Sequence, residues 1–77
     1  MTMPSQAAQV LEKSIRVLGG TWGTHRAVTA LSNAGVGHGG LRAQEKRARQ
    51  ALRDLKAAGV IVQIAPDSAT YRLSDEQ

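Results

Sequence analysis

Apolar residues recur along most of the chain at the three-to-four-residue spacing of amphipathic helices. The first such stretch covers residues 5–18, the second begins near Thr24, and the third covers residues 41–58. Ser5 and Thr24 are residue types that favour the N-cap position, and glycines follow the end of each stretch. The pattern therefore predicts three helices, with Ser5 and Thr24 capping the first and the second.

The C-terminal part of the chain changes to the pattern of strands. Residues 60–65 are rich in β-branched side chains, residues 66–69 have turn composition, and residues 70–73 alternate polar and apolar. Residues 21–23 are too few for a helix and fit a brief strand. The predicted order is helix, short strand, helix, helix and β-hairpin, which is an α+β fold that is mainly α.

The chain has 77 residues, which is enough for one domain with a small core. We expect a single domain over residues 1–77, with its core in about residues 5–73 and a short polar C-terminal tail. The core must consist of Leu, Ile, Val and Ala, because Trp22 and Tyr71 are the whole aromatic content. We expect Trp22 to pack as a lid between the first helix and the hairpin. The absence of cysteine excludes disulfides and thiolate metal sites.

The net charge of +4 comes from the third predicted helix. Residues 41–58 hold six basic and two acidic residues, whereas the rest of the chain holds four of each. On a helix at about 100° per residue, a basic stripe is formed by Arg42, Lys46, Arg49, Arg53 and Lys56. The predicted core face consists of Leu41, Ala48, Leu52 and Leu55. Arg47 and Gln50 lie on the arc opposite this core face. Like charges at such spacing repel one another, and Glu45 compensates only in part, so the stripe indicates a polyanionic partner. The alternative is an ordinary solvated face of Lys and Arg.

The segment Arg47–Ile61 resembles the recognition helix and following strand of winged helix-turn-helix regulators, most closely the GntR and MarR types. In these domains apolar residues spaced four and then three apart precede a helix-ending glycine and an apolar strand. The matching residues here are Ala48, Leu52, Leu55, Gly59 and Ile61. The resemblance covers residues 5–73 and implies a winged-helix fold and a homodimer that binds an inverted repeat. The chain departs from the pattern in its long glycine-rich link before the third helix and in a hairpin turn without Lys or Arg.

The sequence therefore predicts a sequence-specific double-stranded DNA-binding protein, a small repressor-like regulator of transcription with helix 41–58 in the major groove. The candidate DNA contacts on this helix are Arg42, Lys46, Arg47, Arg49, Gln50 and Arg53. Arg and Gln can read guanine and adenine edges as well as meet phosphates. At the start of the second helix, Thr24 and Arg26 fit a phosphate clamp, although Arg26 equally fits a surface arginine without a partner.

Three other functions are weighed against DNA binding. The first is a winged-helix interaction module that docks an acidic protein; such an interface normally has apolar anchors where Arg47 and Gln50 stand. A basic helix on a membrane surface is disfavoured, because the fold already needs the Leu and Ala beside the stripe. Residues 35–40 match G-x-G-x-x-G but follow a helix rather than a strand, so we expect a flexible turn and not a nucleotide site.

Metal binding and catalysis have little support. His25 and His38 are thirteen residues apart without cysteines or an acidic cluster nearby, so we expect no metal, no cofactor and no enzymatic activity. No apolar run reaches the length of about 18 residues that a membrane span needs. We expect a cytoplasmic, nucleoid-associated protein with DNA and a second copy of itself as partners, and without a small-molecule ligand.

Overall fold

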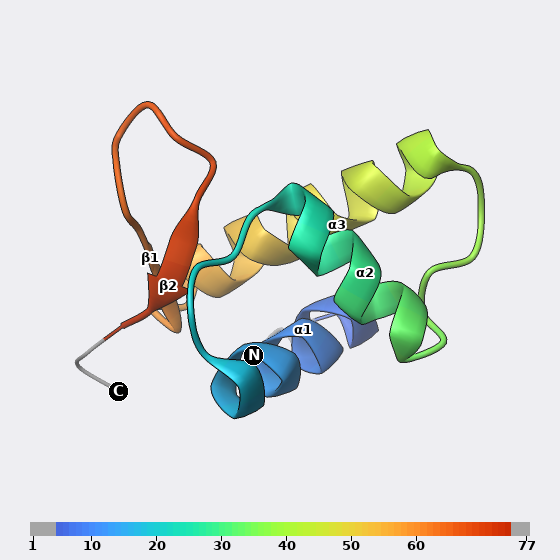
Figure 1. Cartoon of the computed structure of the whole chain (residues 1–77), viewed down its shortest axis with the longest axis horizontal. Helices are drawn as coiled ribbons and strands as arrows, with labels where there is room; N and C mark the ends of the chain where they lie inside the picture. The colour runs from blue at the N-terminus through green and yellow to red at the C-terminus, as the bar shows by residue number, and fades with distance from the viewer. Residues whose placement is uncertain (1–4, 75–77) are drawn as a thin grey trace.

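The structure, a computed structural model, describes residues 5–74. It contains three helices followed by a two-stranded antiparallel sheet, an α+β layout that is mainly α (Figure 1). The elements are α1 (Gln6–Leu18), α2 (Thr24–Asn33), α3 (Leu41–Ala57), β1 (Ile61–Gln63) and β2 (Tyr71–Leu73). The predicted order of helices and hairpin is confirmed. Most of the predicted C-terminal tail lies outside the described residues.

The two predicted N-caps have different outcomes. Ser5 caps α1 as predicted, since its Oγ accepts a hydrogen bond from the Ala8 amide at 3.1 Å. Helix α2 instead has Gly23 as its N-cap, with φ −128° and ψ −176°, and no side-chain cap hydrogen bond. The prediction that Thr24 caps α2 is wrong, because Gly23 takes the extended N-cap conformation and Thr24 is already the first helical residue.

The hairpin is attached to the connection between α1 and α2. After α3, Gly59 adopts φ +80°, a conformation that favours glycine and ends the helix before β1. Strands β1 and β2 pair with Gln63 opposite Tyr71. The predicted strand at residues 21–23 is a single bridge, in which Trp22 and Tyr71 exchange two backbone hydrogen bonds of 2.7 Å. This bridge places the hairpin beside the start of α2.

One cluster of buried side chains lies between the three helices and the hairpin. Trp22 is 0% exposed and belongs to this cluster, as predicted. Leu41 was expected in the core but is 65% exposed, because it stands at the start of α3, about two turns before Ala48, the first buried residue of that helix. On α3, the core position that was not expected from the sequence is Ala51, which is 1% exposed. The spacing of Ala48, Ala51 and Leu55 is the signal that could have found it.

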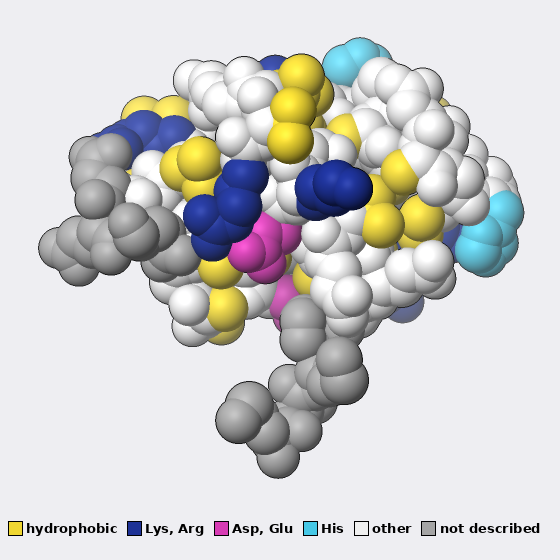
Figure 2. Space-filling model, turned by 90° about the horizontal axis from the view of Figure 1, so that it is seen from below, with side chains coloured by type: hydrophobic (Ala, Val, Ile, Leu, Met, Phe, Trp, Pro, Cys, Tyr) yellow, Lys and Arg dark blue, Asp and Glu magenta, His cyan; other side chains and the backbone are white. Residues whose placement is uncertain are grey.

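The face on which α1 lies shows mixed side chains. In the view from below Figure 1, basic and acidic side chains lie next to one another with hydrophobic side chains around them (Figure 2). On α1 the Arg16 Nε donates to a Glu12 carboxylate oxygen at 2.9 Å, one helical turn away. Such mixing of charges is typical of the solvent side of a helix.

Candidate nucleic-acid interface

The solvent side of α3 carries a row of exposed polar residues. The buried residues that mark the opposite, core side are Ala48, Ala51, Leu52 and Leu55. We call the exposed row the crest; it consists of Arg42, Lys46, Arg49, Gln50 and Arg53. At about 100° per residue, Lys46, Gln50 and Arg53 lie within about 30° of the direction opposite the core, which we call the middle of the crest, and Arg42 and Arg49 lie farther round on one flank. Four of the five crest residues are cations.

Three crest cations lack a counter-charge in the described part of the chain. Between residues 5 and 74, the side chains of Arg42, Lys46 and Arg49 make no hydrogen bond and no ion pair. Neighbouring cations on the crest are three or four positions apart, and each such pair costs an isolated helix about 0.2–0.5 kcal/mol. The crest therefore offers a dense row of cations that form no ion pair among residues 5–74.

The middle of the crest contains a short hydrogen-bonded chain of side chains. Arg53 Nη2 donates to Gln50 Oε1 at 3.2 Å, and Gln50 Nε2 donates to Asp54 Oδ1 at 2.9 Å. Both ends of the Gln50 amide are thereby oriented. Because Arg53 is tied to an uncharged amide and not to a carboxylate, its charge remains available to an anion.

Arg47 does not stand where the sequence analysis placed it. It was expected directly opposite the core, but it is half-buried, and its Nη1 donates to the Val36 carbonyl oxygen at 3.0 Å. The physical reason is the burial of Ala51, which extends the core face of α3 toward Arg47. Arg47 therefore fastens the loop before α3 and is turned away from the crest.

The loop of residues 35–40 is held at more points than the expected flexible turn. Besides Arg47, the Gln44 Nε2 donates to the Gly39 carbonyl oxygen at 2.8 Å. At Gly37 an added Cβ would come within 2.6 Å of Ser32 Cα, so the close approach of the loop to α2 requires glycine. The loop is thus packed against α2 and bonded to α3.

Arg26, which was expected to hold a phosphate, makes its contacts within the fold. Its Nη1 donates to the carbonyl oxygens of Gly19 at 3.0 Å and Thr21 at 2.9 Å, and its Cζ lies 4.0 Å from the centroid of the Trp22 ring. The Trp22 Nε1 donates to the same Gly19 oxygen at 2.9 Å. Arg26 thus fastens the connection between α1 and α2 around the buried tryptophan.

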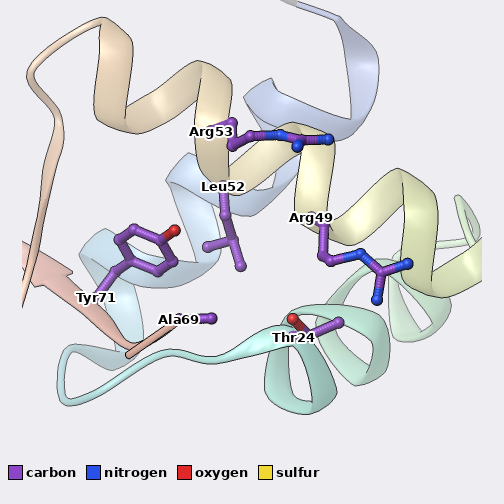
Figure 3. A pocket seen from close by; sticks show the side chains of 6 residues that line it. All are labelled: Thr24, Arg49, Leu52, Arg53, Ala69 and Tyr71. Carbon is purple, nitrogen blue, oxygen red and sulfur yellow. The ribbon is translucent and has the colours of Figure 1, made fainter. Parts of the chain in front are cut away.

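A hollow lies along one flank of the crest, between α3, the start of α2 and the hairpin. Its volume is about 130 Å³, and it is lined by Thr24, Arg49, Leu52, Arg53, Ala69 and Tyr71. Figure 3 shows Leu52 and the Tyr71 ring pointing into the hollow, while the Arg49 guanidinium lies toward the first turn of α2. The structure therefore brings Thr24, Arg49 and Arg53 together, three residues that the sequence proposed as DNA contacts.

A second hollow lies along the other flank of α3. Its volume is about 370 Å³, and its lining comes from the start of α1, the loop and α3: Ser5, Gln6, Ala7, Val36, His38, Arg47, Gln50 and Ala51. Arg47 and Gln50 are the proposed contacts on this side. The crest consequently forms a ridge with a hollow along each of its sides.

Lys56, at the end of the predicted basic stripe, is engaged by the hairpin. Its Nζ donates to Gln63 Oε1 at 2.9 Å. Gln63 was not singled out from the sequence, because a glutamine in a short strand carries no signal of its own.

Within residues 5–74, no three His, Asp or Glu side chains gather in a way that could hold a metal ion. Over the same residues, no helix has the length and apolar character to cross a membrane. Comparisons of the chain with models of protein families, with curated proteins and with solved structures find no match. The geometry of α3 and its neighbours is therefore the evidence on function.

Proposed function

We propose that this chain is a sequence-specific double-stranded DNA-binding protein, a small regulator of transcription with a winged-helix fold, and that α3 enters the major groove. The observation that carries this proposal is the crest, on which Arg42, Lys46 and Arg49 have no partner among residues 5–74. DNA phosphates supply the missing counter-charge and relieve the repulsion between these cations.

The aromatic residues favour a duplex over single strands as the ligand. Proteins that bind single strands stack bases on exposed aromatic side chains. The aromatic residues of this chain are Trp22 and Tyr71, and both belong to the buried core. Base edges in the groove of a duplex, in contrast, are read by the Arg, Lys and Gln side chains that the crest provides.

The dimensions of the crest fit a short segment of duplex. From Arg42 to Arg53 α3 rises about 16 Å, the length of about five base pairs. In this arrangement Lys46, Gln50 and Arg53, in the middle of the crest, face the base edges, and Arg42 and Arg49 face phosphates. The two DNA backbones would then pass along the two sides of the crest, where the hollows lie. Arg47 is left out of this set because it fastens the preceding loop.

We also propose that two copies bind an inverted repeat, as the resemblance to GntR and MarR regulators implies. A single α3 covers about five base pairs, and so short a sequence recurs throughout a genome. Two recognition helices that read half-sites about one helical turn apart would double the recognised length. Sedimentation of complexes formed on duplexes with one or two half-sites would give the number of bound copies.

Selection of bound sequences from random duplex DNA at physiological salt tests the proposal. We expect enrichment of a short motif arranged as an inverted repeat. Guanine and adenine should be the preferred bases where Arg, Lys and Gln side chains contact the groove. The same selection with Gln50→Ala should give a flatter motif, whereas Lys13→Ala on α1 should leave the motif unchanged. Failure to enrich any sequence would contradict the proposal. Specific binding of an acidic protein through the crest would instead support the alternative function, an interaction module that docks an acidic protein.

A further inference from the structure

The loop of the hairpin, residues 64–70, is organised around the side chain of Gln63. The Gln63 Nε2 donates to the carbonyl oxygens of Ser68 and of Pro66, the latter at 3.4 Å. Gln63 is the last residue of β1 and is half-buried. Since both acceptors lie across the loop, one side-chain amide closes a turn that has neither Lys nor Arg of its own.

The orientation of the Gln63 amide is set from α3. Its Oε1 accepts the hydrogen bond from Lys56 Nζ, and its Nε2 is thereby turned toward the loop carbonyls. A cationic donor strengthens such a hydrogen bond relative to a neutral one. Lys56, Gln63 and Ser68 thus form a continuous connection from α3 to the far side of the loop.

The loop is one wall of the hollow beside the crest. Ala69 and Tyr71 line this hollow opposite Arg49 and Arg53 (Figure 3). Ser68 directly precedes Ala69 and is itself held twice, by the bond from Gln63 and by its own Oγ, which donates to Thr70 Oγ1 at 2.6 Å. Any shift of the loop therefore changes the width of the hollow.

We infer that Gln63 is a positioning residue of the DNA-binding surface, which sets the hairpin loop at a fixed distance from α3 for one strand of the sugar–phosphate backbone. Lys56 acts through Gln63 and does not contact phosphate itself. The effect on DNA affinity rests on the proposed function, whereas the effect on the loop does not.

The first experiment tests the loop without DNA. Amide hydrogen exchange is measured in the full chain for the wild type and Gln63→Ala, at the loop amides of Ile64 and Ser68, which donate to loop carbonyls. Loss of the closing bonds should speed exchange at these amides about three- to tenfold and leave α1 unchanged. Gln44→Ala, which removes a glutamine bond at the other end of α3, is the matched control and should leave the hairpin unchanged. Unaltered exchange in Gln63→Ala would overturn the inference.

The second experiment measures duplex affinity against salt for Gln63→Ala, Lys56→Met and the double variant. We expect each single variant to bind several-fold more weakly with the salt slope of the wild type, and the double variant to bind no more weakly than Gln63→Ala. A slope smaller by about 0.9 in Lys56→Met, or additive losses, would show a direct phosphate contact and overturn the role of Lys56. If the wild type binds no duplex, the proposed function fails, while the exchange data still decide whether Gln63 positions the loop.

Discussion

Helix α1 forms an ion pair on its solvent side, whereas no cation of helix α3 forms an ion pair within residues 5–74. On the inner side the two helices are alike, since both pack Ala, Leu or Ile side chains into the same buried cluster. On the outer side of α1, Arg16 bonds to Glu12. On the outer side of α3, the described structure gives Arg42, Lys46 and Arg49 no such partner.

This difference separates the buried side chains, which the fold needs, from the exposed cations of α3, which it does not need. The inner sides supply the burial that stabilises so small a domain. The outer side of α3 contributes no ion pair among residues 5–74 and, through like-charge neighbours, costs about 1 kcal/mol. A feature that lowers the stability of the free protein is best understood through a ligand that neutralises it.

The largest expected effect tests whether the buried sides of α1 and α3 contribute similarly to the free energy of unfolding. Leu11→Ala on α1 and Leu52→Ala on α3 should each lower the free energy of unfolding by about 2–5 kcal/mol, because both residues are fully buried. Leu41→Ala, at the exposed start of α3, is the control and should change it by less than about 0.5 kcal/mol. Denaturant titration measures all three. Equal losses for Leu41 and Leu52 would mean that the first turns of α3 are also packed against the core.

The next effect tests the contrast between the outer sides. Gln50→Ala and Arg53→Ala should each weaken binding to the preferred duplex by about 1–3 kcal/mol, because both stand in the middle of the crest. Arg16→Ala on α1 is the matched control, and duplex affinity should stay within experimental error. Fluorescence anisotropy with a labelled duplex provides the measurement. An equal loss for Arg16 would remove the distinction between the two helices.

A smaller effect sharpens the difference between cations that the fold uses and those that it leaves free. Arg26→Ala should lower the free energy of unfolding by about 1–2 kcal/mol, since it loses the contact with the Trp22 ring and two hydrogen bonds to carbonyl oxygens. Arg49→Ala should leave thermal stability nearly unchanged. Thermal unfolding followed by circular dichroism compares the two; a stable Arg26→Ala variant would return Arg26 to the candidate phosphate contacts.

The smallest effect concerns repulsion along the crest. The double variant Arg42→Gln/Arg49→Gln should raise stability by about 0.2–0.5 kcal/mol at low salt, because it removes three like-charge neighbours and, in part compensation, two attractions to Glu45. Glu12→Gln on α1 should instead lower stability by about 0.3–0.5 kcal/mol, through loss of the pair with Arg16. Both effects should shrink as salt is added. A loss of stability in the crest variant would mean that these cations support the fold.

Local patterns predicted the elements of the fold well. The Ser5 cap, the end of α3 at Gly59 and the two strands depend on neighbouring residues, so the sequence contains their signals. The burial of Trp22 followed from the shortage of other large apolar residues. In each case the deciding interaction spans few residues or concerns composition alone.

The candidate site was predicted less completely, because its details depend on contacts between separate elements of the fold. Arg47 bonds to a carbonyl eleven residues earlier, and Arg26 folds back over Trp22. Lys56 and Gln63 meet only once the hairpin has packed beside α3. Helical periodicity gives the direction of a side chain from its axis, but it contains no information on the carbonyl group or ring that lies there.

The salt dependence of duplex binding tests the central claim most directly. If Arg42 and Arg49 each neutralise one phosphate, as proposed, the logarithm of the binding constant should fall with the logarithm of salt concentration with a slope of about −1.8 per protomer. Titrations of a duplex between about 50 and 200 mM salt cover the useful range. A slope close to this value supports α3 as the DNA-binding surface, whereas a slope near zero would contradict it.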